Sequence, residues 1–257
     1  METRGVEIIR RAVPAALCAS VRDAVLVEAR RRSTPLRRVA DLLGLDRSVR
    51  SPWNRTHVAL PLTSDVETAL KAAARALADA DVFKRAGLGG AADLVELSAM
   101  VADPGASDQK AHTDVAPETG GRTCTLWIAL QDVDAIHGPT AVWTHPPSTV
   151  AAYDWGALKA PKMTTYEPDG SEDPDAPPPK PHPFAAGEPE VLTARVGDVF
   201  LMDCRTFHRG TANTSRVPRA QLSATFQIGV DGDSGFTYQL RDDVPRLTLA
   251  DVLGEGT

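Results

Sequence analysis

The chain has 257 residues, enough for one buried core, and its hydrophobic share of 42% and charged share of 24% are those of an ordinary soluble globular protein. The net charge of −6 argues against nucleic acid as a partner, and no apolar run predicts a membrane span or a signal peptide. The three cysteines form neither a zinc motif nor a disulfide framework, so we expect a reducing, intracellular and cytoplasmic setting.

Residues 1–92 are expected to form helices that support a core further along the chain. Apolar residues recur near helical spacing from Pro14 to the arginine run at residues 30–32, a run that binds phosphate in some proteins but more often is a solvated helix end. Ser-Asp-Val-Glu at residues 64–67 is a capping-box pattern, and the alanine-rich stretch after it predicts a helix that ends at Gly87. Between the two helices, residues 53–62 are expected to be extended, with Arg55 as a candidate substrate contact.

Beyond residue 92 the pattern changes to strands. Residues 94–101, 123–130, 199–202 and 221–230 are apolar or alternating runs of strand length. Helices followed by many strands predict an α+β fold, and we expect a double-stranded β-helix (a cupin-like jelly roll) at residues 93–230, flanked by the N-terminal helices. Residues 231–257 would form a C-terminal extension, and the whole chain, 1–257, a single domain.

A proline-rich insertion at about residues 153–190 interrupts the strands. It holds nine of the twenty prolines together with many acidic residues, and such a composition cannot build a core element. Long insertions in compact domains are either functional lids or tolerated solvent loops. We expect this one at the mouth of a pocket, with Tyr153, Trp155 and Tyr166 as candidate substrate contacts.

Two histidines and one aspartate stand out by their spacing. His112 and Asp114 are one residue apart, so on a strand both side chains point the same way, and His208 closes a later strand. Two imidazoles and one carboxylate on one face of a metal leave other positions open, as in non-haem Fe(II) oxygenases. Arg219, eleven residues after His208, would then hold the carboxylate of an oxo-acid beside the iron.

The second half of the chain resembles the phytanoyl-CoA dioxygenase-like family of Fe(II)/2-oxoglutarate oxygenases. The resemblance rests on Gln-x-x-His-x-Asp at residues 109–114, Thr-x-Trp-x-Ala-Leu-x-Asp at 125–132, Gly-Pro-Thr at 138–140 and a His…Asn-x-Ser…Arg block at 208–219. It implies three iron ligands and three contacts to 2-oxoglutarate. The ligands would be His112, Asp114 and His208, and the contacts Arg219, at the distal carboxylate, with Gln109 and Thr140 in support.

Two details qualify this resemblance. Family members usually carry Pro-Gly-Ser-His after the Gly-Pro element, whereas this chain has Trp-Thr-His-Pro-Pro at residues 143–147. The pocket wall near Thr140 is therefore expected to differ from that of other members. Asn213 is expected to shape the turn after the metal strand rather than to contact the co-substrate.

Together these residues predict an Fe(II)/2-oxoglutarate-dependent dioxygenase that uses O2 to hydroxylate a small organic substrate and releases succinate and CO2. Asp114 fills the position that a halogenase leaves vacant for halide, which favours hydroxylation, while desaturation and ring formation stay open because substrate placement selects among them. Two alternatives belong to other classes. A cupin-type isomerase or hydrolase that needs no O2 would give no reason for Arg219, and a non-enzymatic ligand-binding jelly roll would predict a degraded triad. Iron-dependent binding of 2-oxoglutarate is required only by the oxygenase.

Overall fold

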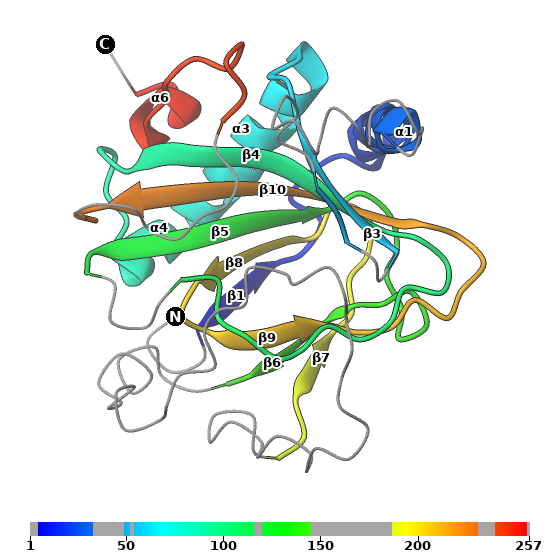
Figure 1. Cartoon of the computed structure of the whole chain (residues 1–257). Coiled ribbons are helices and arrows are strands. Elements are labelled where there is room, and N and C mark those ends of the chain that lie inside the picture. Colours follow the sequence, from blue (N-terminus) through cyan, green and yellow to red (C-terminus); the bar gives the residue numbers. More distant parts are fainter. Residues whose placement is uncertain are drawn as a thin grey trace.

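The computed structural model describes residues 5–32, 49–51, 54–115, 120–144, 187–230 and 240–255. Two antiparallel sheets face each other, and helices cover the outer face of the larger sheet (Figure 1). The strands of the larger sheet are β1 (Val6–Ile9), β2 (Val49–Ser51), β3 (Arg55–Ala59), β4 (Asp93–Ala102), β5 (Arg122–Ala129), β8 (Val199–Asp203) and β10 (Arg219–Ile228). Those of the smaller sheet are β6 (Thr140–Trp143), β7 (Glu190–Leu192) and β9 (Phe207–Gly210). This is the predicted jelly-roll core with flanking helices.

The order of the strands brings distant parts of the sequence together. It is β1-β8-β5-β10-β4-β3-β2 in the larger sheet and β7-β6-β9 in the smaller. Strands as well as helices lie within the first 92 residues. β3, inside the stretch predicted to be extended, pairs with β4. β1 pairs with β8 and was not predicted, which corrects our expectation of helices at the start of the chain. β1 has only four residues, too few for an alternating pattern to distinguish it from a loop.

The helices of the described residues are α1 (Ala15–Arg32), α3 (Ser64–Asp79), α4 (Val82–Ala86) and α6 (Leu249–Leu253). None of them is long and apolar enough to cross a bilayer. The single helix predicted up to Gly87 is in fact two, because α3 ends at Asp79 and the short α4 ends at Gly87 in the left-handed conformation. The cap also differs: Thr63, not Ser64, accepts the hydrogen bond from the Val66 amide.

Alternation along β10 separates the two faces of the larger sheet. Its even-numbered residues from Ala220 to Phe226 pack in the core beneath the helices, and its odd-numbered residues from Arg219 to Thr225 face the smaller sheet. The space between the sheets holds a second, smaller apolar cluster, which includes Ala129, Phe200 and Val142. The rest of this inner face is polar, and it positions the site described below.

The proline-rich insertion connects two neighbouring strands. β6 ends at Trp143, β7 begins at Glu190, and the two strands pair directly. Residues 145–186, with Tyr153, Trp155 and Tyr166, lie outside the described residues. The C-terminal extension returns to the core, where the Leu249 amide donates to the carbonyl of Ala92 and α6 packs against α3.

Candidate active site

His112, Asp114 and His208 converge, although 96 residues separate the two histidines. The backbones of His112 and His208 form a β-bridge with reciprocal N–H···O distances of 2.9 Å. Asp114 Oδ1 lies 3.7 Å from Nε2 of His112 and 3.5 Å from Nε2 of His208. One donor atom from each of the three residues falls within 4.8 Å of the others. His112 and Asp114 lie outside the strands, which differs from the prediction, and the isolated bridge from His112 to His208 on β9 brings the three groups around one point.

Each imidazole is turned so that Nε2 faces this point. His112 Nδ1 lies 2.8 Å from the carbonyl oxygen of Lys110, and His208 Nδ1 lies 2.9 Å from that of Thr206. A carbonyl oxygen only accepts, so Nδ1 carries the proton in both rings and Nε2 keeps its lone pair. Burial and the charge of His208 lower the pKa of His112, which favours the neutral form.

The donor set fits a divalent metal. Two imidazole nitrogens and one carboxylate oxygen suit iron, and orientation of Nδ1 by a carbonyl is the usual support for a metal-binding histidine. His208 is buried, whereas His112 and Asp114 are partly exposed. The group is therefore anchored on one side and accessible on the other. Within the described ranges no other three His, Cys, Asp or Glu residues converge in this way.

Two buried arginines adjoin the triad. Arg55 on β3 and Arg219 on β10 are both register partners of Ala102 on β4, so their side chains leave the same face of the sheet. They are 2% and 3% exposed, respectively. Gly210 follows His208 by two residues on the same face of β9, and a Cβ atom there would lie 3.2 Å from Cζ of Arg55. The guanidinium of Arg55 therefore lies beside Gly210, two residues along β9 from His208 of the triad.

These arginines carry buried hydrogen-bond donors that are only partly used. Nη2 of Arg55 donates to the carbonyl oxygens of Ser107 at 2.9 Å and Thr211 at 2.6 Å. Nε and Nη1 of Arg55 and Nε of Arg219 find no acceptor among the described residues. Burial and the charge of Arg55 lower the pKa of Arg219 to about 9. Two buried like charges with unused donors are costly, and a carboxylate between them would remove much of that cost.

Gln109 connects the two metal-bearing segments. Its Oε1 accepts a hydrogen bond of 2.9 Å from the amide of Gly210, while the Gln109 amide donates to the Gly210 carbonyl at 2.9 Å. A Cβ at position 210 would overlap Oε1 of Gln109, so only glycine permits this approach. The side-chain carbonyl of Gln109 is thus already hydrogen-bonded to the backbone near His208. Its role as a co-substrate contact remains a prediction.

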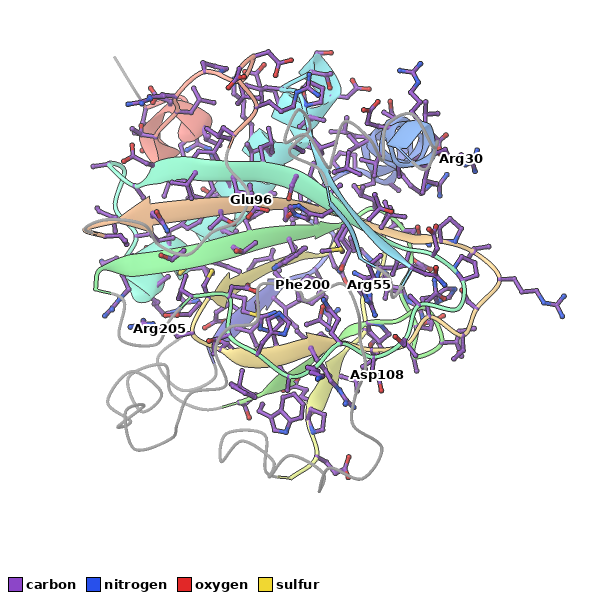
Figure 2. The ribbon with its side chains drawn as sticks, viewed as in Figure 1. Arg30, Arg55, Glu96, Asp108, Phe200 and Arg205 are labelled. Atoms are coloured by element: carbon purple, nitrogen blue, oxygen red, sulfur yellow. The ribbon has the colours of Figure 1, made fainter. Side chains whose placement is uncertain are left out.

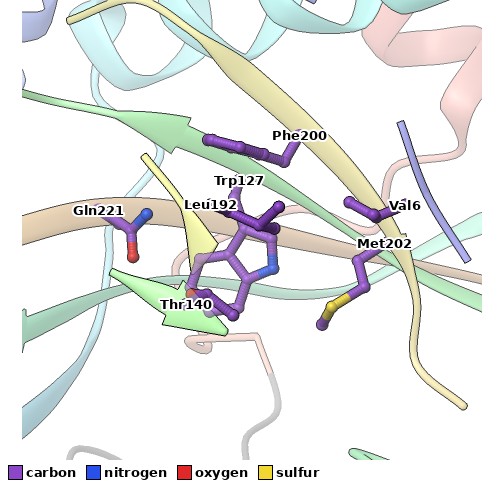
Figure 3. A pocket seen from close by; sticks show the side chains of 7 residues that line it. All are labelled: Val6, Trp127, Thr140, Leu192, Phe200, Met202 and Gln221. Carbon is purple, nitrogen blue, oxygen red and sulfur yellow. The ribbon is translucent and has the colours of Figure 1, made fainter. Parts of the chain in front are cut away.

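Thr140 lies on the wall of a pocket between the two sheets (Figure 3). The wall opposite includes Gln221, two residues after Arg219 on the same face of β10, and Trp127 on β5. Apolar side chains complete the pocket: Val6, Leu192, Phe200 and Met202. Thr140 also pairs with Gly210 across β6 and β9. Gly210 is the residue that Arg55 packs against, so Thr140 lies close to this part of the site. A family-like motif selected Thr140, whereas no sequence pattern pointed to Gln221.

A buried polar network on the same face was also missed. Glu96 accepts hydrogen bonds from Ser98 at 2.8 Å and Thr225 at 2.7 Å, and Nε2 of His57 lies 3.0 Å from it (Figure 2 labels Glu96). Thr125 lies 2.9 Å from Thr225, so the network crosses from β3 to β5. Burial raises the pKa of Glu96, but the hydrogen bonds from these donors outweigh it and hold the pKa below its usual value. Polar residues at every second position of β10 were the signal for this network.

Asn213 shapes the turn before β10, as the sequence predicts. It is fully buried, and its Nδ2 donates to the carbonyl oxygens of Ala102 at 2.8 Å and Val217 at 2.9 Å. Its Oδ1 accepts from the hydroxyl of Ser215 at 2.7 Å. These bonds fix the turn that leads to Arg219, and they use the side chain completely.

Comparison with known proteins places these features in a family context. The family model for phytanoyl-CoA dioxygenase (PhyH) matches residues 1–220. Comparison with curated proteins finds no match.

Several solved structures share the fold. The epimerase SnoN from nogalamycin biosynthesis is 20% identical over 96% of this chain and 94% of its own, with a TM-score of 0.59. The carbocyclase SnoK from the same biosynthesis is 19% identical over 88% of this chain and 80% of its own, with a TM-score of 0.50. HygX from Streptomyces hygroscopicus, solved with nickel, 2-oxoglutarate and hygromycin B, is 12% identical over 88% of this chain and 84% of its own, with a TM-score of 0.51.

Proposed function

The chain belongs to the phytanoyl-CoA dioxygenase family of iron- and 2-oxoglutarate-dependent enzymes, and from this premise we propose that it hydroxylates a small organic molecule with O2. The observation that carries the proposal is a His-Asp-His cluster together with two buried arginines, of which Arg55 packs against Gly210, two residues after His208 on β9. A metal-only isomerase needs the first feature but has no use for the second. A binding module without a metal needs neither.

In this proposal three residues hold Fe(II). His112 and His208 each bind it through Nε2, and Asp114 binds it through a carboxylate oxygen. Arg219 and Arg55 bind the distal carboxylate of 2-oxoglutarate with their unused donors. Two residues along a strand span about 7 Å, which suits an oxo-acid that reaches from the metal to a carboxylate beside Gly210. Thr140 and Gln221 both line the pocket between the sheets, and in this proposal they support the co-substrate.

Bound iron and 2-oxoglutarate supply the activation of O2, coupled to decarboxylation of the oxo-acid to succinate. The protein orients the reactants and excludes water from the polar interior. Asp114 matters for the outcome, because its carboxylate occupies the position that a halogenase leaves for halide. The proposed net reaction inserts one oxygen atom of O2 into a C–H bond and places the other in succinate.

The names of two fold relatives point to two further candidate outcomes. SnoN is an epimerase and SnoK a carbocyclase. The mass of the product distinguishes the three reactions. Hydroxylation adds one oxygen atom, ring closure removes two hydrogens, and epimerisation leaves the composition unchanged.

The first experiment is anaerobic visible spectroscopy of the metal-free protein, with Fe(II) added and then 2-oxoglutarate. We expect a charge-transfer band that requires both additions. His208→Ala should abolish it by removing one of three protein ligands. A folded protein that takes up iron but gives no band would favour the isomerase or hydrolase, and one that takes up no iron would favour the binding module.

A further inference from the structure

The turn between β8 and β9 supports two of the three triad residues at once. The carbonyl oxygen of Cys204 accepts the amide of Asp114 at 2.9 Å. The carbonyl oxygen of Thr206 lies 2.9 Å from Nδ1 of His208 and so orients that ring. Any shift of this short turn would move a carboxylate and an imidazole together.

A buried ion pair within the turn fixes its shape. The carboxylate of Asp203 accepts from the amide of Arg205 at 3.0 Å, from Nε at 2.9 Å and from Nη2 at 2.6 Å (Figure 2 labels Arg205). Both side chains are buried, and the hydrogen bonds to Asp203 raise the pKa of Arg205. A planar fork that meets a carboxylate through two nitrogens tolerates little rotation. The geometry of Cys204, between the two charged residues, is thereby restricted.

The N-terminal segment holds the same turn from the other side. The carbonyl oxygen of Gly5 accepts the amide of Asp203 at 2.9 Å and the hydroxyl of Thr206 at 3.1 Å. Gly5 has a positive φ of 68°, and a Cβ there would overlap the side chain of Thr206. Both ends of the turn are therefore anchored to the segment that leads into β1.

Compared with an apolar pair of similar volume, the ion pair is expected to add little to global stability. Asp203 and Arg205 are two residues apart, so their contact joins no distant parts of the chain. Burying both charges costs desolvation, and apolar residues of similar volume often stabilise a fold as well or better. What the pair does supply is a rigid orientation for the carbonyl groups on either side of Arg205.

We propose that Asp203 and Arg205 are positioning residues for the metal centre, which they serve by fixing the carbonyl oxygens that orient Asp114 and His208. The inference rests on the proposed function, since it requires a metal at the triad. Partners that orient metal ligands typically contribute 10- to 100-fold in metal affinity. Removal of Arg205 alone also leaves Asp203 as an unpaired buried charge, which lowers stability, so metal affinity is compared among folded variants.

The test uses the full chain and Co(II) as the probe, because Co(II) absorption reports both affinity and coordination geometry. Arg205→Met should weaken Co(II) binding by about 10- to 100-fold and shift its absorption bands, and Arg205→Lys should lie between this variant and the wild type. The matched control is Arg10→Met. Arg10 pairs with Asp198 at 2.7 Å, at the opposite end of the β1–β8 pairing, and contacts no triad residue. It should bind Co(II) like the wild type.

The outcomes separate the two ideas. Absence of Co(II) binding by the wild type would overturn the proposed function itself. Wild-type binding, with unchanged affinity and bands in both Arg205 variants, would overturn the positioning role alone. An equal loss of affinity in Arg10→Met would also overturn it, since the effect would then be general destabilisation. If Arg205→Met does not fold, Arg205→Lys, which retains the charge, decides the question.

Discussion

At the scale of single residues, Arg219 offers the sharpest test of the co-substrate site. Arg219→Ala should weaken 2-oxoglutarate binding by about 1.5–3 kcal/mol, the value of a hydrogen bond to a charged group. The measurement is a titration of the iron-loaded protein with 2-oxoglutarate under anaerobic conditions. Arg195→Ala is the control, because Arg195 is exposed and pairs with Asp132 and Asp134, neither of which belongs to the triad. Unchanged affinity in Arg219→Ala would mean that another group binds the distal carboxylate.

Arg55 should behave differently from Arg219. It also donates to the carbonyl oxygens of Ser107 and Thr211, so its removal disturbs two loops as well as the anion site. From the sequence, Arg219 was predicted to bind 2-oxoglutarate, whereas Arg55 was predicted only to contact the substrate. The structure explains this difference. Arg219 belongs to a motif with fixed spacing from His208. Arg55 reaches the site only through the pairing of β3 with β4, which no local pattern encodes.

Glu96 predicts a specific acid sensitivity. Its pKa in the folded protein is held below the ordinary value of 4.5, so its contribution to stability is complete above that pH and is lost as the pH falls through the folded-state pKa. Glu96→Gln should therefore flatten the decline in the free energy of unfolding below about pH 5. Urea unfolding from pH 6 to pH 3.5 measures this. Glu67→Gln, at an exposed carboxylate, is the control. Equal acid slopes for Glu96→Gln and the wild type would show that other groups govern the decline.

At the scale of elements, the first turn of α3 distinguishes the predicted cap from the observed one. The sequence pattern selects Ser64, whereas Oγ1 of Thr63 accepts the amide of Val66. Thr63→Ala should lower the free energy of unfolding by about 1 kcal/mol, the usual cost of losing such a cap. Ser64→Ala should change it far less, because Ser64 is the first residue of the helix. Urea denaturation of both variants measures the difference, and a larger loss in Ser64→Ala would restore the sequence-based assignment.

Long elements were predictable from the sequence and short ones were not. β4, β5, β8 and β10 have five to ten residues and carry clear apolar or alternating patterns. β1, β2, β6, β7 and β9 have three or four residues each, which is too short for a period of two to be distinguished from chance. The pairing of His112 with His208 was inferred from chemistry instead, since two ligands to one metal must meet. Metal-ligand types thus supplied the long-range contact that strand patterns could not.

At the scale of the whole molecule, the buried polar network on the inner face of the larger sheet could not be predicted from the sequence. The polar side chains of Glu96, Ser98 and Thr225 come from strands that are distant in sequence but adjacent in the sheet. Each would be an unremarkable half-buried polar residue in its own strand. Their meaning depends on the order β5-β10-β4-β3, which is a property of topology. Composition and spacing indicate the class of fold but not which polar groups share a buried face.

The connection between β6 and β7 makes the proline-rich insertion removable in principle. Val142 pairs with Glu190 and Thr140 with Leu192, so the two strands that flank the insertion meet in register. Nε1 of Trp143 donates to the carbonyl oxygen of Gly187 at 3.0 Å, which brings the two flanks of the connection together. The described ends of the insertion are thus already close enough for a short linker.

Replacement of residues 153–186 by a short Gly-Ser linker should therefore leave the fold intact. A shorter connection lowers the entropy cost of closing the loop, with an expected gain of about 1 kcal/mol in the free energy of unfolding. Iron-dependent 2-oxoglutarate binding should persist, because the triad and both arginines lie outside the insertion. Substrate turnover should change if the insertion contacts the substrate. Urea unfolding, the charge-transfer band and product formation together measure these effects. A scrambled insertion of equal length is the control: wild-type turnover in that variant would assign the insertion a spacer role, whereas loss of folding in the shortened chain would make it a structural element.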